Sequence, residues 1–118
     1  MKLIILVLLF ISSPAFASDW SKDDVTREAI ILVIHTVDWG QTRTIAKNPN
    51  QWRERNAPMG DHPSVSDVNK HFVLTGLVRV GISHFLSPET RKYWQYASIV
   101  IGGTNIARNH HIGLRISF

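Results

Sequence analysis

Histidine and acidic side chains gather in the stretch from His35 to His62, which follows an apolar run. On a helix, residues three and four apart share a face, so His35, Asp38 and Thr42 should lie on one stripe. A carboxylate in an otherwise apolar stripe must find a partner or become protonated, because an unpaired buried charge is strongly unfavourable. Such a group can lock helices together, take part in an ion or proton pathway, or bind a metal ion.

Arg79 is the partner that we expect for Asp38. Each is the single charge in the apolar part of its predicted helix, and an arginine can hold a carboxylate by two hydrogen bonds. We therefore expect a pair that joins two helices, with an ion or proton pathway as the functional alternative. The polar cluster as a whole comprises His35, Asp38, Thr42, Glu54, Asn56, His62, Arg79 and Asn105.

Six histidines, together with Asp38 and Glu54, could supply a metal site of imidazole and carboxylate ligands. The spacings H-x-x-x-H and H-E-x-x-H do not occur. The candidate ligands are His35, Asp38 and His71, and the alternative is that the histidines are hydrogen-bonded or solvated. The chain has no cysteine and no G-x-S-x-G motif, so no thiolate nucleophile, catalytic residue or cofactor is predicted.

The first 17 residues predict export. Lys2 precedes nine apolar residues, and Ser-Ser-Pro-Ala-Phe-Ala follows, a pattern typical of a secretory signal cleaved after Ala17. We predict a signal peptide over 1–17 and a single helical domain over 18–118, located in the inner membrane or periplasm of a bacterial envelope. The formal charge is +4 with scattered basic residues, so nucleic-acid binding is not expected, whereas attraction to anionic lipid is compatible with this charge.

Three helices should position the polar residues, which makes the predicted fold all-α: a small bundle of three mature helices. The expected ranges are 23–47, 68–86 and 88–109. Each follows a serine that can cap a helix, namely Ser21, Ser64 and Ser87. The segment between the first two helices contains three prolines and is long enough to suggest a functional loop.

The apolar runs are shorter than a membrane span. The longest, 72–86 and 97–107, have 15 and 11 residues, whereas a spanning helix needs about 20. All three helices are nevertheless apolar around most of their circumference for part of their length, unlike a soluble bundle with a clear polar face. We expect Gly102–Gly103 to face Gly76 and Gly81, so that the second and third helices can approach closely.

The C-terminal residues alternate between apolar and polar, with Ile112, Leu114, Ile116 and Phe118 on one face. This pattern predicts a short edge strand or extended arm that packs on the helices or on a partner chain. An unpaired apolar strand also favours a homo-oligomer. This alternating tail with its terminal phenylalanine resembles the closing strand of outer-membrane barrels. It supports an outer-membrane-targeted factor as another alternative. The helical chain before it cannot supply the other strands of a barrel.

Two motifs resemble small uncharacterised helical membrane proteins of bacteria and phages. They are D-W-G-Q-T at 38–42 and E-x-N-x-x-x-G-x-H-P at 54–63, and the resemblance extends over about residues 25 to 110. The chain departs from the pattern at Ala57, where a proline is usual, although Pro58 follows at once. The resemblance implies membrane association and no activity, and we accordingly expect a transmembrane helix.

These observations favour an exported, membrane-associated envelope protein with a structural or partner-binding role and no identifiable reaction. Its expected partners are membrane lipid and either a second copy of the chain or another envelope protein. The alternative is a small metal-binding protein or hydrolase that uses the Asp38 and His35 cluster.

Overall fold

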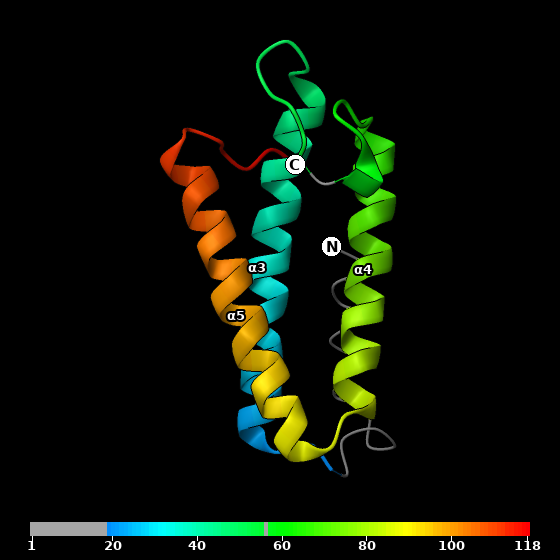
Figure 1. Ribbon diagram of the computed structural model, residues 1–118, viewed down its shortest axis with the longest axis vertical. Coiled ribbons are helices and arrows are strands. Elements are labelled where there is room, and N and C mark those ends of the chain that lie inside the picture. Colours follow the sequence, from blue (N-terminus) through cyan, green and yellow to red (C-terminus); the bar gives the residue numbers. More distant parts are fainter. Residues whose placement is uncertain (1–18, 56) are drawn as a thin grey trace.

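The computed structural model describes residues 19–55 and 57–118, and within them the fold is a bundle of three helices (Figure 1). Helix α3 spans Lys22–Lys47, α4 spans Val65–Phe85 and α5 spans Pro88–His111, and the short 3-10 helix η1, Ala57–Met59, lies in the loop between α3 and α4. No strand occurs in the described residues. The all-α prediction is confirmed, while the predicted signal peptide, 1–17, lies outside the described residues.

Serine side chains cap all three helices, as predicted. The Ser21 hydroxyl accepts a hydrogen bond from the Asp24 backbone N–H at 3.0 Å, and the Asp24 carboxylate accepts one from the Ser21 N–H at 3.0 Å. Ser64 and Asp67 form the same reciprocal capping box on α4. Because α4 starts directly after its cap, at Val65, it begins three residues before the predicted start at 68.

Helix α3 lies at the centre of the bundle, against both α4 and α5 (Figure 1). A Cβ at Gly76 would lie 3.2 Å from His35 Nε2, and a Cβ at Gly102 would lie 2.8 Å from Ile34 Cγ2. Gly76 of α4 and Gly102 of α5 therefore make room for α3. The expectation that they face one another is wrong, because α4 and α5 make far fewer contacts with each other than with α3.

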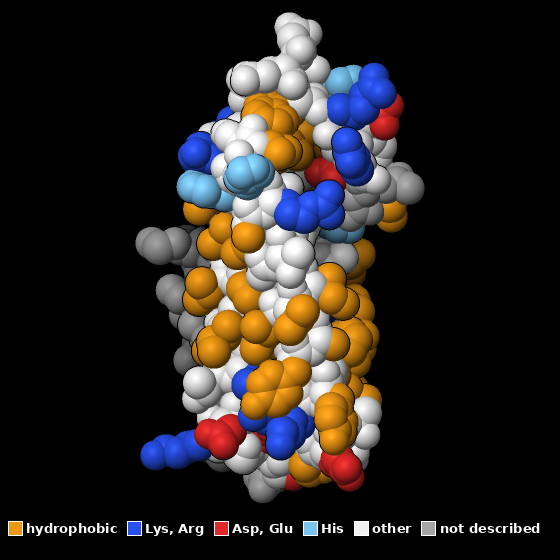
Figure 2. Space-filling model, turned by 60° about the vertical axis from the view of Figure 1, so that its left-hand side comes forward, with side chains coloured by type: hydrophobic (Ala, Val, Ile, Leu, Met, Phe, Trp, Pro, Cys, Tyr) orange, Lys and Arg blue, Asp and Glu red, His pale blue; other side chains and the backbone are white. Residues whose placement is uncertain are grey.

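The exposed side chains in the middle of the bundle are apolar. On α4, all exposed residues after Lys70 are apolar, and the same is true on α5 between Lys92 and Thr104 and on α3 between Thr26 and Lys47. Figure 2 shows this apolar surface on one side of the molecule, with charged side chains towards both ends. We call it the apolar belt; it consists of Ile30, Val33, Leu74, Leu77, Val78, Ile82, Phe85, Tyr93, Tyr96, Ala97, Val100 and Ile101.

None of the three helices combines the length and the apolar character that crossing a membrane requires, within residues 19–55 and 57–118. The expected transmembrane helix is therefore not found there.

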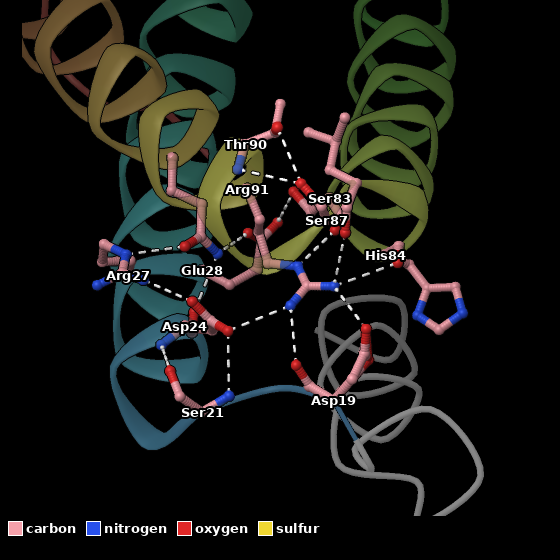
Figure 3. Close-up of polar contacts among 12 residues, drawn as sticks. Asp19, Ser21, Asp24, Arg27, Glu28, Ser83, His84, Ser87, Thr90 and Arg91 are labelled. Atoms are coloured by element: carbon pink, nitrogen blue, oxygen red, sulfur yellow. Dashed lines mark hydrogen bonds and ion pairs between the residues drawn. The ribbon is translucent and has the colours of Figure 1, made fainter.

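A buried arginine joins the three helices at the end of the bundle near Ser21 (Figure 3). The Arg91 side chain is fully buried. Its guanidinium donates to the carbonyl oxygens of Ser83 at 2.7 Å and Leu86 at 3.0 Å, and to Asp24 Oδ2 at 3.2 Å. It also lies over the Trp20 ring, 4.6 Å from the centroid. Because these partners come from α3, α4 and the α4–α5 turn, Arg91 fixes how the helices meet.

Glu28 lies beside this network and is also almost fully buried, at 1% exposure. Its two carboxyl oxygens accept hydrogen bonds from Gln95 Nε2 at 2.8 Å and from the Ser83 hydroxyl at 3.2 Å. Burial raises the pKa of Glu28, while these hydrogen bonds and the charges of Arg79 and Arg91 act in the opposite direction. The interior at this end is thus held by polar contacts more than by apolar packing.

Residues 112–118, which follow α5, form the C-terminal arm and lie along α3. The Ser117 N–H donates to the Gly40 carbonyl at 3.0 Å, and Arg43 Nε donates to the Ser117 carbonyl at 3.0 Å. Leu114 is buried, whereas Ile112 and Ile116 keep more than half of their surface exposed, at 62% and 52%. The predicted arm is confirmed. Ile112, Leu114 and Ile116 were expected to pack on the helices or a partner chain, and of these only Leu114 is buried.

Candidate functional site

A cleft of about 710 Å³ lies at the end of the bundle that carries the α3–α4 loop and the C-terminal arm. Figure 2 shows apolar, acidic and basic side chains side by side at this end. The walls come from α3, the loop, α4, α5 and the arm, and they consist of Asp38, Thr42, Ile45, Trp52, Arg53, Glu54, Arg55, Met59, Phe72, Asn105, Arg108, Asn109, Ile112 and Leu114. Both signs of charge therefore face one cavity.

Asp38 is the acidic group that α3 contributes to this cleft. Its Oδ1 accepts a hydrogen bond from Asn105 Nδ2 on α5 at 3.3 Å. Burial raises the pKa of Asp38 to about 6, and the negative charge of Glu54 adds to the rise, while the Arg79 charge and the Asn105 hydrogen bond oppose it. With this pKa the Asp38 carboxyl group binds or releases a proton close to neutral pH, and a nearby positive charge would stabilise its ionised form.

Glu54 reaches the cleft from the α3–α4 loop, whose backbone is held by its own hydrogen bonds. The Glu54 N–H donates to the Asp61 carbonyl at 2.9 Å, and the Trp52 N–H donates to the Asn48 carbonyl at 3.0 Å. Gly60 has a φ of 75°, a conformation that suits glycine and lets the chain turn there. These contacts place a second carboxyl group within electrostatic range of Asp38.

Basic side chains line the same cleft and are exposed. They are Arg53 and Arg55 from the loop and Arg108 from α5. Arg53 Nε lies 3.8 Å from Asp61 Oδ2, an exposed and therefore weak ion pair. Among the described residues, Arg55 and Arg108 form no ion pair within 4.0 Å. We call these three arginines the arginine rim.

The D-W-G-Q-T motif brings the elements of this end together around α3. Trp39 Nε1 donates to Asn69 Oδ1 on α4 at 2.9 Å. Gly40 receives the C-terminal arm, and Gln41 Nε2 donates to the Ile106 carbonyl on α5 at 3.1 Å. Three consecutive residues thus contact α4, the arm and α5, which places Asp38 between them.

The structure brings together four members of the predicted polar cluster. Asp38, Thr42, Glu54 and Asn105 all line the cleft, and the Thr42 hydroxyl donates to the Asp38 carbonyl at 2.8 Å. The other members do not line it: His35, His62 and Arg79 lie elsewhere, and Asn56 lies outside the described residues. His62 is an exposed loop residue.

The expected ion pair between Asp38 and Arg79 is not found. The ion pairs within 4.0 Å among the described residues involve Arg27, Arg53 and Arg91. Arg79 instead acts at longer range: its positive charge opposes the rise that burial causes in the pKa of Glu28 and of Asp38. Its charge thus acts on two carboxyl groups that lie ten positions apart on α3.

The candidate metal ligands do not form a metal centre in the part of the chain that the structure describes. No group of three or more histidine and acidic side chains is placed to hold an ion there. His35 Nε2 instead lies 2.8 Å from the Phe72 carbonyl oxygen, a hydrogen bond, and burial lowers the pKa of His35. The ring of His71 meets the Phe72 ring edge-on, with centroids 5.3 Å apart.

Several lining residues were not predicted. Arg108 and Asn109 lie three and four residues after Asn105, so they share its helix face. This spacing could have predicted that they line the same cleft. Asn109 Nδ2 donates to Gln41 Oε1 at 3.1 Å and so ties this part of α5 to α3. The loop arginines, Arg53 and Arg55, gave no such signal, because their side-chain direction depends on the turn that the loop makes.

No protein family matches this chain, and no curated protein or solved structure matches it. The resemblance to small helical membrane proteins stays a prediction that rests on the motif residues.

Proposed function

We propose that the protein is an exported envelope protein that associates with a membrane through the apolar belt and offers the cleft as a binding site at the membrane surface. The observation that carries this proposal is the belt. Its exposed apolar side chains come from all three helices. Contiguous exposed apolar surface of this kind is typical of membrane or protein contact sites.

The belt has a sharp border on each helix. On α4 its first and last residues are Leu74 and Phe85, and eleven steps of about 1.5 Å give a height of roughly 16 Å. On α5, Tyr93 and Tyr96 lie at one border, and tyrosine side chains are typical of the boundary between lipid and water. This length is about half of the roughly 30 Å hydrocarbon core, so the belt is too short to span it and suits a bundle that lies in the interfacial region of a bilayer.

The end with the cleft is basic. Its exposed cations are Lys47, Arg53, Arg55, Lys70, Arg108 and Arg115. Each lysine or arginine close to an anionic membrane contributes roughly 1 kcal/mol of attraction. We infer that this end faces lipid headgroups, which places the cleft where it can meet a headgroup or a membrane-bound partner. The role is binding, with no reaction assigned.

A fluorescence experiment tests the belt. The chain has no cysteine, so a single engineered cysteine can carry an environment-sensitive dye without interference. We expect dyes at Leu77→Cys and Val100→Cys to shift to the blue and to be quenched by vesicles of brominated lipid. Dyes at Ser66→Cys and Thr104→Cys, exposed sites beyond the belt on the same two helices, serve as matched controls and should respond much less.

Two outcomes would contradict the proposal. One is the absence of any response to vesicles at the two belt positions. The other is a blue shift that appears without vesicles and grows with protein concentration, which would show that a second copy of the chain covers the belt. Export is tested separately: N-terminal sequencing of the protein from expressing bacteria should begin at Ser18, and an intact Met1 would refute it.

A further inference from the structure

We propose that the cleft binds a phosphoethanolamine headgroup, with the ammonium group at Asp38 and Glu54 and the phosphate at the arginine rim. The inference deepens the proposed function, on which its lipid form rests, since it names the ligand class of the cleft. It stands on the composition and geometry of the cleft walls.

The two carboxyl groups favour a cation that can donate hydrogen bonds. Asp38 and Glu54 lie within electrostatic range of each other, and a positive charge between them would relieve their repulsion. A primary ammonium has three donors. The neighbouring acceptors suit it, because the Asn105 amide and the Thr42 hydroxyl line the same cleft. A quaternary ammonium has no N–H to donate.

The arginine rim favours an anionic group on the same ligand. Arg53, Arg55 and Arg108 face the cleft together with the two carboxyl groups. A simple metal cation would be repelled by three guanidinium groups, and a simple anion would be repelled by the carboxylates. Guanidinium groups bind phosphate through paired hydrogen bonds. A zwitterion with its charges a few atoms apart satisfies both halves of the cleft.

The apolar walls suit the carbon atoms of such a ligand. Ile45, Phe72 and Leu114 line the cleft and are buried, with exposures of 8%, 5% and 2%. They are held by the surrounding helices and the arm, so this side of the cleft is preformed. Buried apolar walls also lower the local dielectric constant, which strengthens the interaction of the charged groups with a zwitterion.

The test uses two soluble diesters that differ only in the ammonium group, glycerophosphoethanolamine and glycerophosphocholine. Titration calorimetry on the full chain should show at least tenfold tighter binding of the ethanolamine compound. Asp38→Asn and Arg108→Gln should each weaken that binding at least tenfold. Asp23→Asn and Lys92→Gln remove one acidic and one basic group at the far end of the bundle and should leave it unchanged. Circular dichroism confirms that each variant keeps its helices.

Other results would overturn the proposal. They are equal binding of the choline compound, equal binding of β-alanine, or binding of glycerophosphoethanolamine that does not change in Asp38→Asn. Each would show that the cleft does not read an ammonium and a phosphate together.

Vesicle flotation separates the two proposals. With phosphatidylethanolamine in a phosphatidylcholine vesicle, we expect several-fold more bound protein than with phosphatidylcholine alone, and the excess should vanish in Asp38→Asn. Equal flotation with both vesicles, together with no binding of the soluble diester, would leave the membrane function standing and refute the headgroup site. Binding of the soluble diester without flotation would refute the membrane function and leave the cleft as a binding site for a free zwitterion.

Discussion

A Cβ on Gly40 would lie 2.5 Å from Ile116 Cγ2 and 2.7 Å from the Phe118 ring, so the C-terminal arm can lie on α3 only because residue 40 is glycine. The arm in turn covers part of the cleft with Ile112 and Leu114. The arm and the candidate site therefore depend on the same small residue.

Gly40→Ala should release the arm. The methyl group leaves no room for Ile116 and Phe118, while alanine itself favours the helix by roughly 1 kcal/mol over glycine. We expect faster removal of the last residues by carboxypeptidase, with the helix content retained. Gly81→Ala is the matched control, because a Cβ there meets nothing within 4 Å; it should raise stability slightly and leave the arm protected. An equally protected arm in both variants would contradict the close contact.

Asp38→Asn should stabilise the protein above about pH 6. The folded pKa of about 6 lies above the ordinary value of 3.8, so the folded state binds more protons than the unfolded state between these values. Stability from this group is therefore full at low pH and declines as pH rises to about 6. The two pKa values set an upper limit of about 3 kcal/mol for the loss.

Urea unfolding at pH 8 and pH 4.5 measures this effect. The asparagine variant should exceed the parent clearly at pH 8, and the difference should be much smaller at pH 4.5. Asp23→Asn, an exposed change on the same helix, controls for loss of a negative charge. Destabilisation at pH 8 would mean that a partner holds the Asp38 carboxylate ionised.

Arg91→Met should destabilise the bundle by roughly 3 to 5 kcal/mol, because it leaves the Asp24 carboxylate and several carbonyl groups without their donor. Arg91→Lys should recover little, since an ammonium cannot reproduce the spread of donors in a guanidinium. Thermal or urea unfolding measures both. Lys92→Met is exposed and should change stability by less than about 0.5 kcal/mol; a similar loss at 91 and 92 would show that burial of the arginine is not the cause.

Binding of glycerophosphoethanolamine should weaken between pH 8 and pH 5. Asp38 loses its charge as pH falls through about 6, while the diester phosphate keeps its own. The other groups that act on Asp38 are Glu54 from the loop, Arg79 from α4 and Asn105 from α5, and Arg108 lines the same cleft. Calorimetry at the two pH values should show about a tenfold loss. Unchanged affinity would contradict a role for the ionised Asp38 side chain.

The helices were predictable because their signals are local. Ser21, Ser64 and Ser87 mark the three starts through contacts that span only three residues. The alternation at the C-terminus likewise predicted extended backbone. It could not reveal the partner, because the Ser117 N–H pairs with a helix carbonyl at Gly40, and a backbone carbonyl leaves no trace in sequence.

The charged residues were harder to place. Arg91 looks like an ordinary residue in the first turns of a helix, and its burial depends on carbonyl groups that converge at the α4–α5 turn. Arg79 was expected to pair with Asp38, and this ion pair is not found, because the periodicity of α4 does not reveal how that helix is rotated and shifted against α3. The positive charge of Arg79 consequently acts on both Glu28 and Asp38. Four residues of the cluster still line the cleft. Asp38 and Thr42 lie one turn apart on α3, and Glu54 lies in the loop that follows this helix.

The interior of this bundle sets its response to heat. The largest fully enclosed side chains include Arg91, Gln95, Glu28 and Ser83, while large apolar side chains remain outside. Exposure of apolar groups raises the heat capacity on unfolding and exposure of polar groups lowers it. Calorimetry in aqueous buffer should therefore give a heat-capacity increment below the usual value of roughly 12 to 15 cal/mol/K per residue. In mild detergent, which would cover the outer apolar groups of the folded state, the increment should rise and the melting temperature with it.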